Sequence, residues 1–172
     1  MATHCPTCKS ENPDTASFCA DCGTQLDASE GQEEAETVGH RWVLAKVLYT
    51  AERWEEARML FENLHSEIPE NLDYLGFLGT LAARRGDRDE ALRISDLLEN
   101  DKRPYSFGLH AFYRANIAAL LGEKELAVKL LQEAHTQGIR FIFFHCHSEP
   151  NVMDLEPLHD YPPFQEFMRP KG

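Results

Sequence analysis

Long apolar runs are missing from this 172-residue sequence, whose longest aromatic-rich patch, from Phe141 to Phe144, has only four residues. A transmembrane helix needs about 20 consecutive, mostly apolar residues. No signal peptide precedes His4. We therefore expect no membrane-spanning segment and no membrane partner.

Positive charge is also scarce. There are 17 Lys and Arg residues against 29 Asp and Glu residues, which gives a formal net charge of −12. Such an acidic chain repels phosphate backbones, so we expect no nucleic-acid partner. The hydrophobic content of 42% and the aromatic content of 10% indicate a globular protein and not a disordered one.

Common catalytic motifs are absent too, since the chain has no G-x-S-x-G, no H-E-x-x-H, no phosphate loop and no dinucleotide fingerprint. The nearest approach to a reactive cluster is His145, Cys146 and His147. In a strand, the two histidines would lie on one face and the cysteine on the other, which leaves at most two local metal ligands. We therefore expect a buried cysteine between surface histidines, and no enzyme.

Cysteine occurs five times, and four of the five form two C-x-x-C pairs: Cys5, Cys8, Cys19 and Cys22. Each pair lets two thiolates of one tight turn bind the same ion, and two such turns complete the tetrahedral sulfur shell that zinc prefers. So short a segment cannot bury enough apolar surface to fold alone, so the metal would supply its folding free energy. The pattern predicts one structural Zn²⁺ with no open coordination position.

The knuckles HCPTC and CADCG resemble those of short bacterial zinc ribbons, and the resemblance covers residues 4–26. Iron is the rival metal, because rubredoxins have similar knuckles. Rubredoxins, however, need a longer chain and several core aromatic residues, whereas only Phe18 is present here. Paired spacing without an export signal indicates reduced metal ligands and a cytoplasmic protein.

The organisation of the chain changes twice after the ribbon. Residues 27–37, DASEGQEEAET, hold five acids, no base and no large apolar side chain, which predicts an extended acidic linker. From residue 38 the apolar spacing becomes helical. It predicts helices over residues 38–51, 54–66, 71–85, 88–100, 105–121 and 124–137.

These helices repeat. Segments that begin at Ala51, Arg85 and Leu121 each contain a turn, a charged pair, a small alanine and apolar residues at helical spacing. The alanines are 34 and 36 residues apart, and two turn glycines are 36 apart: Ala57, Ala91 and Ala127, with Gly86 and Gly122. Periods of this size indicate stacked helix pairs.

Residues 38–138 resemble tetratricopeptide repeats. The family has a small residue in each first helix, an alanine early in the second helix and a larger apolar residue four positions later, which fits Ala45, Gly79, Ala115, Phe61 and Leu131. Pro69 ends a unit, whereas Ser95 and Pro104 depart from the pattern. The resemblance implies an all-α protein, an α-α superhelix of about three helix pairs. A coincidental amphipathic bundle is the alternative.

The proline-rich residues 139–172 are predicted to cap the last pair, because a repeat array otherwise ends in an exposed apolar face. Prolines forbid a long helix in this segment. Its apolar side chains would fold over the array: Phe141, Phe143, Leu155, Leu158, Phe164 and Phe167.

In tetratricopeptide arrays the first helices line a groove that holds a peptide or a partner helix. The resemblance therefore implies a partner-binding groove lined by Trp42, Lys46, Tyr49, Phe77, Thr80, Arg84, Phe112, Tyr113 and Asn116. Only Lys46 and Asn116 match the polar clamp of the subgroup that binds C-terminal carboxylates. Rings such as Trp42 and Phe112 can instead pack between helices.

We expect a non-catalytic adaptor that binds a protein or peptide partner through this groove, with the ribbon as a second contact. Self-association through either surface is also open. The alternatives are a zinc-ribbon factor associated with transcription or RNA, and an enzyme that uses the histidines and cysteine at 145–147.

Overall fold

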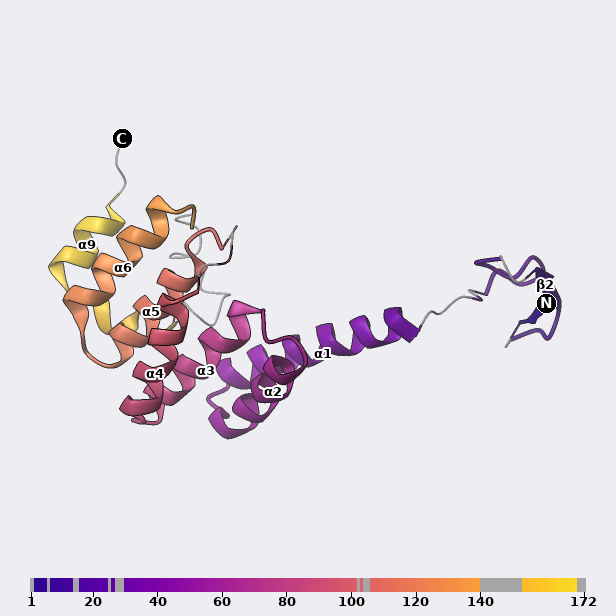
Figure 1. The fold of residues 1–172 in the computed structure, drawn as a ribbon, viewed down its shortest axis with the longest axis horizontal. Coiled ribbons are helices and arrows are strands. Elements are labelled where there is room, and N and C mark those ends of the chain that lie inside the picture. The colour runs from indigo at the N-terminus through magenta and orange to yellow at the C-terminus, as the bar shows by residue number, and fades with distance from the viewer. Residues whose placement is uncertain are drawn as a thin grey trace. The chain divides into compact units, whose positions relative to one another are not determined.

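The computed structural model describes residues 2–5, 7–13, 16–24, 26, 30–101, 103, 106–139 and 153–169. The chain divides into two units, Met1–Arg41 and Trp42–Gly172 (Figure 1).

The first unit begins with a two-stranded antiparallel sheet. Strands β1 (Ala2–His4) and β2 (Glu11–Pro13) pair so that His4 lies opposite Glu11 and Ala2 lies opposite Pro13. The chain reverses between the strands through the first cysteine pair. The sheet therefore fixes the two ends of that turn.

Helix α1 (Glu30–Thr50) begins eight residues before the helix expected from residue 38. This corrects the prediction that residues 27–37 are extended, as far as the described residues 30–37 are concerned. The physical reason is that glutamate, glutamine and alanine are good helix formers, and that acidic residues near a helix N-terminus interact favourably with the helix dipole. The density of acidic residues in this stretch therefore does not prevent a helix.

Five further helices follow, and their bounds agree closely with the predicted ones in four cases. They are α2 (Trp54–Glu67), α3 (Leu72–Arg84), α4 (Arg88–Glu99), α5 (Leu109–Leu120) and α6 (Lys124–Thr136). Helix α5 begins four residues later than expected. Gly108 precedes it in a left-handed conformation, with φ of 85°, which a continuous helix does not allow.

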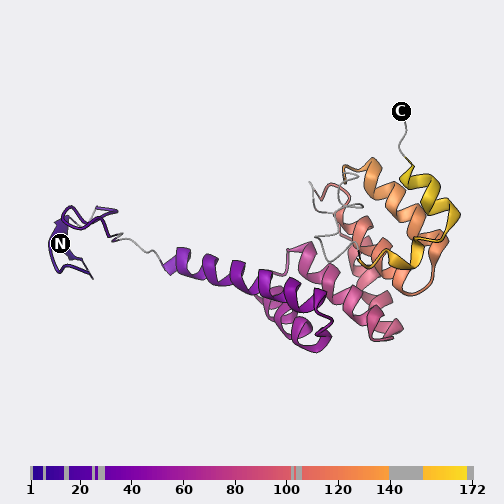
Figure 2. The same ribbon diagram turned by 180° about the vertical axis from the view of Figure 1, so that it is seen from behind.

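The predicted fold class, an all-α array of helix pairs, is confirmed. Helix α3 packs against α4 of its own pair and against α2 and α5 of the neighbouring pairs, and α5 packs in turn on α6. Figures 1 and 2 show the successive pairs side by side from opposite directions. Each pair therefore buries its apolar face against the next pair.

The three pairs turn in the same way. Glu52, Gly86 and Gly122 all have left-handed backbone conformations, with φ of 58°, 78° and 80°. In the second turn the N–H of Gly86 donates to the carbonyl of Ala83, and the N–H of the next residue donates to the carbonyl of Ala82. The same two bonds recur in the other turns. This is the Schellman arrangement, so the predicted glycine spacing has a backbone cause.

Small residues allow the helices to approach closely. The six predicted small positions are buried: Ala45, Ala57, Gly79, Ala91, Ala115 and Ala127. A Cβ atom on Gly79 would lie only 2.5 Å from Cδ1 of Ile117 on α5 and 2.9 Å from Cγ2 of Ile94 on α4. A larger side chain at this position would separate α3 from both neighbours.

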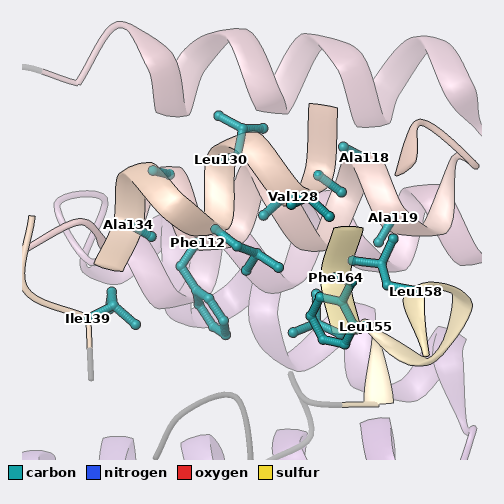
Figure 3. Packing of buried hydrophobic residues seen from close by; sticks show 14 residues of the cluster. Phe112, Ala118, Ala119, Val128, Leu130, Ala134, Ile139, Leu155, Leu158 and Phe164 are labelled. Atoms are coloured by element: carbon teal, nitrogen blue, oxygen red, sulfur yellow. The ribbon is translucent and has the colours of Figure 1, made fainter. Parts of the chain in front are cut away.

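The C-terminal segment covers the last pair, as expected. A 3₁₀ turn, η1 (Glu156–Leu158), packs on α5, and α9 (Pro162–Met168) packs on α6. Figure 3 shows Leu155, Leu158 and Phe164 grouped beside Ala119, and all three are buried. Phe167 is partly buried against the same cluster. The other two predicted capping residues, at 141 and 143, lie outside the described residues.

Glu52 gives a test of the turn assignment. Replacing Glu52 with glycine relieves the left-handed penalty of a side chain, partly offset by greater chain entropy, and should raise the free energy of unfolding by roughly 0.5–1 kcal/mol. Gly86→Ala should lower it by about 1 kcal/mol. Urea unfolding followed by circular dichroism measures both. A destabilised Glu52→Gly variant would contradict the assignment.

Candidate functional site

The four cysteines of the first unit lie together. Their Sγ atoms are all within 4.8 Å of one another. The distance from Cys5 Sγ to Cys22 Sγ is 3.5 Å, and that from Cys8 Sγ to Cys19 Sγ is also 3.5 Å. Disulfide sulfurs are about 2.05 Å apart, so these thiols are free. Tetrahedral sulfurs around zinc are about 3.8 Å apart, so the four thiols fit a metal ion.

The first cysteine turn is closed by backbone bonds. The Cys5 carbonyl accepts a hydrogen bond from the N–H of Lys9 at 3.0 Å, and the Cys5 N–H donates to the carbonyl of Ser10 at 2.9 Å. Lys9 has a left-handed conformation, with φ of 67°. The Ser10 hydroxyl lies 3.1 Å from Cys8 Sγ. These bonds therefore fix the orientation of both cysteines of the pair.

The second turn reproduces the first, 14 residues later. The Cys19 carbonyl accepts from the N–H of Gly23 at 2.9 Å, and the Cys19 N–H donates to the carbonyl of Thr24 at 2.7 Å. Gly23 is left-handed, with φ of 72°. The Thr24 hydroxyl lies 3.1 Å from Cys22 Sγ. The site thus consists of two equivalent halves, each with a hydroxyl beside its exposed cysteine, Cys8 or Cys22.

Asn12 joins the two halves. Its side-chain amide donates to the carbonyl of Ser10 at 3.0 Å and to Cys19 Sγ at 3.6 Å, while its oxygen accepts from the N–H of Ala20 at 3.0 Å. Only 3% of Asn12 is exposed. The cysteine spacing gives no indication of Asn12. The hydroxyls of the two turns do have a signal in the sequence, a Ser or Thr two residues after the second cysteine of each pair.

Backbone donors favour the thiolate form of the two buried cysteines. The N–H of Cys8 donates toward Cys5 Sγ at 3.5 Å and lowers the pKa of Cys5 to about 6. The N–H of Cys22 likewise lowers the pKa of Cys19. Because a metal binds thiolates and not thiols, these backbone groups make Cys5 and Cys19 better ligands near neutral pH.

The predicted groove residues lie on the first helices of the three pairs, but most of them are not open to solvent. Trp42, Lys46 and Arg84 are half-buried. Six others have at most 1% of their surface exposed: Tyr49, Phe77, Thr80, Phe112, Tyr113 and Asn116. In this structure these six side chains are closed to an incoming chain. Their role in binding stays a prediction.

The aromatic side chains among these residues are buried by packing against one another. The rings of Phe61 and Phe77 stack at 4.7 Å, with an angle of 4° between their planes. Trp42 meets Phe77 edge-on at 5.5 Å, Tyr49 does so at 5.0 Å, and Tyr113 lies 5.8 Å away. Phe77 therefore joins rings from α1, α2, α3 and α5. The alternative that Trp42 packs between helices describes its ring better than an open groove does.

The first helices of the three pairs, α1, α3 and α5, form one face of the array, which we call the inner face. The C-terminal segment supplies a polar group to this face. Asp154 is fully buried, and its Oδ1 accepts a hydrogen bond from the Tyr49 hydroxyl at 2.6 Å. The same oxygen accepts from Nε and an Nη of Arg84 at 2.9 and 2.6 Å. The Arg84 guanidinium also lies over the ring of Trp54, 4.8 Å from its centre. The proline-rich sequence around Asp154 favours a solvated loop, whereas the structure buries this carboxylate.

Among the described residues, Asp154 Oδ2 finds no hydrogen-bond partner, and neither does Nδ2 or Oδ1 of Asn116 on α5. Burial raises the pKa of Asp154 to about 6, although Arg84 and Tyr49 both act to lower it. The carboxylate is thus held firmly through one oxygen and inadequately solvated at the other.

Among the described residues, the four cysteines are the only group of three or more histidine, cysteine or acidic side chains arranged to hold a metal. The candidate cluster at His145, Cys146 and His147 lies outside the described residues. No described helix combines the length and the apolar character needed to cross a bilayer.

Comparison of the chain with protein families, curated proteins and solved structures gives no match. The resemblance to zinc ribbons and tetratricopeptide repeats therefore depends on the residues and geometry of this chain alone.

Asn12→Ala should weaken metal binding 10- to 100-fold, the usual effect of losing a partner that orients metal ligands. The physical reason is that Asn12 fixes Cys19 and the second turn against the first. Competition with a chromogenic chelator measures the affinity. Glu11→Gln, at an exposed neighbouring position, is the control and should bind metal like the unaltered chain. Equal affinities for all three proteins would refute the role of Asn12.

Asp154 predicts a pH dependence of stability. Its pKa of about 6 lies above its ordinary value of 3.8, so the folded state binds the proton more tightly than the unfolded state. The resulting stabilisation is complete below about pH 4 and is lost as the pH rises through 6. Lowering the pH from 7 to 5 should therefore add roughly 1 kcal/mol from this group.

Urea unfolding of the unaltered chain and of Asp154→Asn, at both pH values, isolates this contribution, because the other titrating groups are common to the two proteins. The asparagine variant should lack the extra 1 kcal/mol or so. The same pH dependence in both proteins would show that the carboxyl does not titrate in this range.

Proposed function

We propose that this chain is a non-catalytic adaptor of the tetratricopeptide-repeat type, which holds a segment of a protein partner on the inner face of its helical array and carries a structural zinc ribbon as a second contact.

The repeat geometry supports the family assignment. The three turns have a left-handed residue at the same position and the same pair of backbone hydrogen bonds. The small residues of the first and second helices are buried at matching positions. Stacked pairs with periods of 34 and 36 residues are typical of such repeats.

One observation carries the proposal that the inner face binds a chain segment: it already holds one. Residues 153–158 of the same chain lie there, with Asp154 bonded to Tyr49 of α1 and Arg84 of α3 and with η1 against α5. The surface therefore has a polar anchor and apolar contacts for a short segment with a 3₁₀ turn, which are the features of peptide-recognition sites.

Zinc is the metal that the sulfur site supports best. Four thiolates complete a tetrahedral shell, so the ion has no position left for substrate or water and acts structurally. Cys8 and Cys22 are exposed, and Phe18, the one aromatic side chain nearby in sequence, is 61% exposed. An iron centre of the rubredoxin kind would lack the aromatic shell that shields it. Reduced thiols of this kind agree with a cytoplasmic location.

The exposed ring of Phe18 is also our candidate for the second contact. Large exposed aromatic side chains are enriched at protein interfaces. The ribbon's scarcity of lysine and arginine disfavours a phosphate partner. We therefore propose that the ribbon contacts protein and not nucleic acid.

Lys46 provides the test of inner-face binding. Full-length, zinc-loaded protein is immobilised and the captured proteins are quantified by mass spectrometry. Lys46→Glu reverses a half-buried charge on the inner face, beside Trp42, and should reduce partner capture at least tenfold by repulsion and lost contact.

Lys129→Glu is the matched control, because it makes the same charge change at an exposed position of α6. It should capture the same proteins as the unaltered chain. The proposal fails if all three proteins capture identical sets in identical amounts, provided that circular dichroism shows all three to be folded.

A further inference from the structure

The segment around Asp154 contacts the first helix of every pair. Asp154 itself bonds to Tyr49 on α1 and to Arg84 on α3. One residue later, Leu155 belongs to a buried cluster with Phe112 of α5. Six residues of chain, which end in a 3₁₀ turn, therefore contact the first helices of all three pairs.

The apolar contacts follow a definite spacing. Leu155 and Leu158 are fully buried, whereas Glu156 between them is exposed. Both leucines lie in the cluster formed with α5 and α6 (Figure 3). Counted from the acid, the buried apolar positions are the first and the fourth that follow. The resident segment thus combines an acidic residue with buried apolar residues at +1 and +4.

Charge explains why the anchor is acidic. The chain has a net charge of −12, yet the inner face presents two cations, Lys46 and Arg84. Arg84 keeps 18% of its side chain exposed, although the carboxylate that it binds is fully buried. The guanidinium is therefore accessible to a second carboxylate, and its planar fork suits that group.

We propose that residues 153–158 are a resident ligand of the inner face, and that the partner is a protein segment of the same chemistry, an acidic residue with apolar residues at +1 and +4, which displaces them from Arg84 and Tyr49. This inference rests on the proposed function, since it names the kind of segment that the adaptor binds. The resident segment has the advantage of being tethered, so a free ligand displaces it only with a better fit or in large excess.

A fluorescent peptide with the sequence of residues 153–169 is the probe. Its binding to the full-length chain is measured by anisotropy, with the unaltered protein and with Asp154→Asn. The substitution weakens the bonds of the resident segment to Arg84 and Tyr49, while the peptide keeps its own aspartate. The variant should therefore bind the peptide at least tenfold more tightly than the unaltered chain.

Two changes test whether the carboxylate is recognised. A peptide with asparagine in place of its aspartate should bind the Asp154→Asn protein at least tenfold more weakly than the original peptide. Adding Arg84→Met to that protein should abolish the preference between the two peptides. Circular dichroism and thermal melting establish that each variant is folded. Equal binding of both peptides by the folded Asp154→Asn protein would overturn the inference.

Hydrogen exchange gives an independent measurement on the unaltered chain, where no variant can misfold. Excess peptide should speed exchange of the amides of residues 153–169 as the resident segment leaves. Continued protection, with no peptide binding to the folded variant, would make the segment a permanent cap and overturn the inference. The adaptor proposal would then still stand or fall on Lys46→Glu.

Light scattering tests the remaining possibility, that a second copy of the chain occupies the inner face. A monomer at all concentrations agrees with a resident ligand and a separate partner. A dimer that the peptide converts to monomers would mean that the segment of a second copy fills the inner face. That outcome would overturn the assignment of the partner as another protein.

Discussion

The close approach of the first helices at their small residues determines the rest of the helical unit. At Gly79 there is no space for a Cβ atom, because Ile117 and Ile94 already occupy it. Helices this close bring the aromatic side chains of adjacent pairs into contact, so Phe77 and Tyr113 become core residues and not a recognition surface. One constraint therefore both aligns the repeats and closes much of the expected groove. What stays accessible is the edge that the half-buried charged residues line.

Much of the fold was predictable from sequence because its causes are local. The turn glycines, the period of the alanines and the spacing of apolar residues each act within one helix pair, and the helix bounds followed from them. The start of α5 was mispredicted because Gly108 was not recognised as a left-handed break. The early start of α1 was missed because linker composition was given more weight than helix propensity.

The candidate sites were predictable to the extent that their causes are local in sequence. The cysteine ligands could be predicted because both pairs have a local spacing with one chemical meaning. The partners that orient them could not, because Asn12 acquires its role only when the two turns meet. Asp154 is the extreme case. Its partner Tyr49 is 105 residues away, and nothing in a proline-rich tail distinguishes a buried carboxylate from a solvated one.

That buried carboxylate also explains how an apolar cap keeps a single position. Leucine side chains alone pack nearly as well when a segment shifts by one residue, because dispersion and burial are not directional. An ion pair with Arg84 and a hydroxyl bond from Tyr49 are directional, so only one register satisfies them. The desolvation of Asp154 offsets much of what these bonds contribute, as expected for a buried charge. Specificity without great stability is the property that an exchangeable ligand requires.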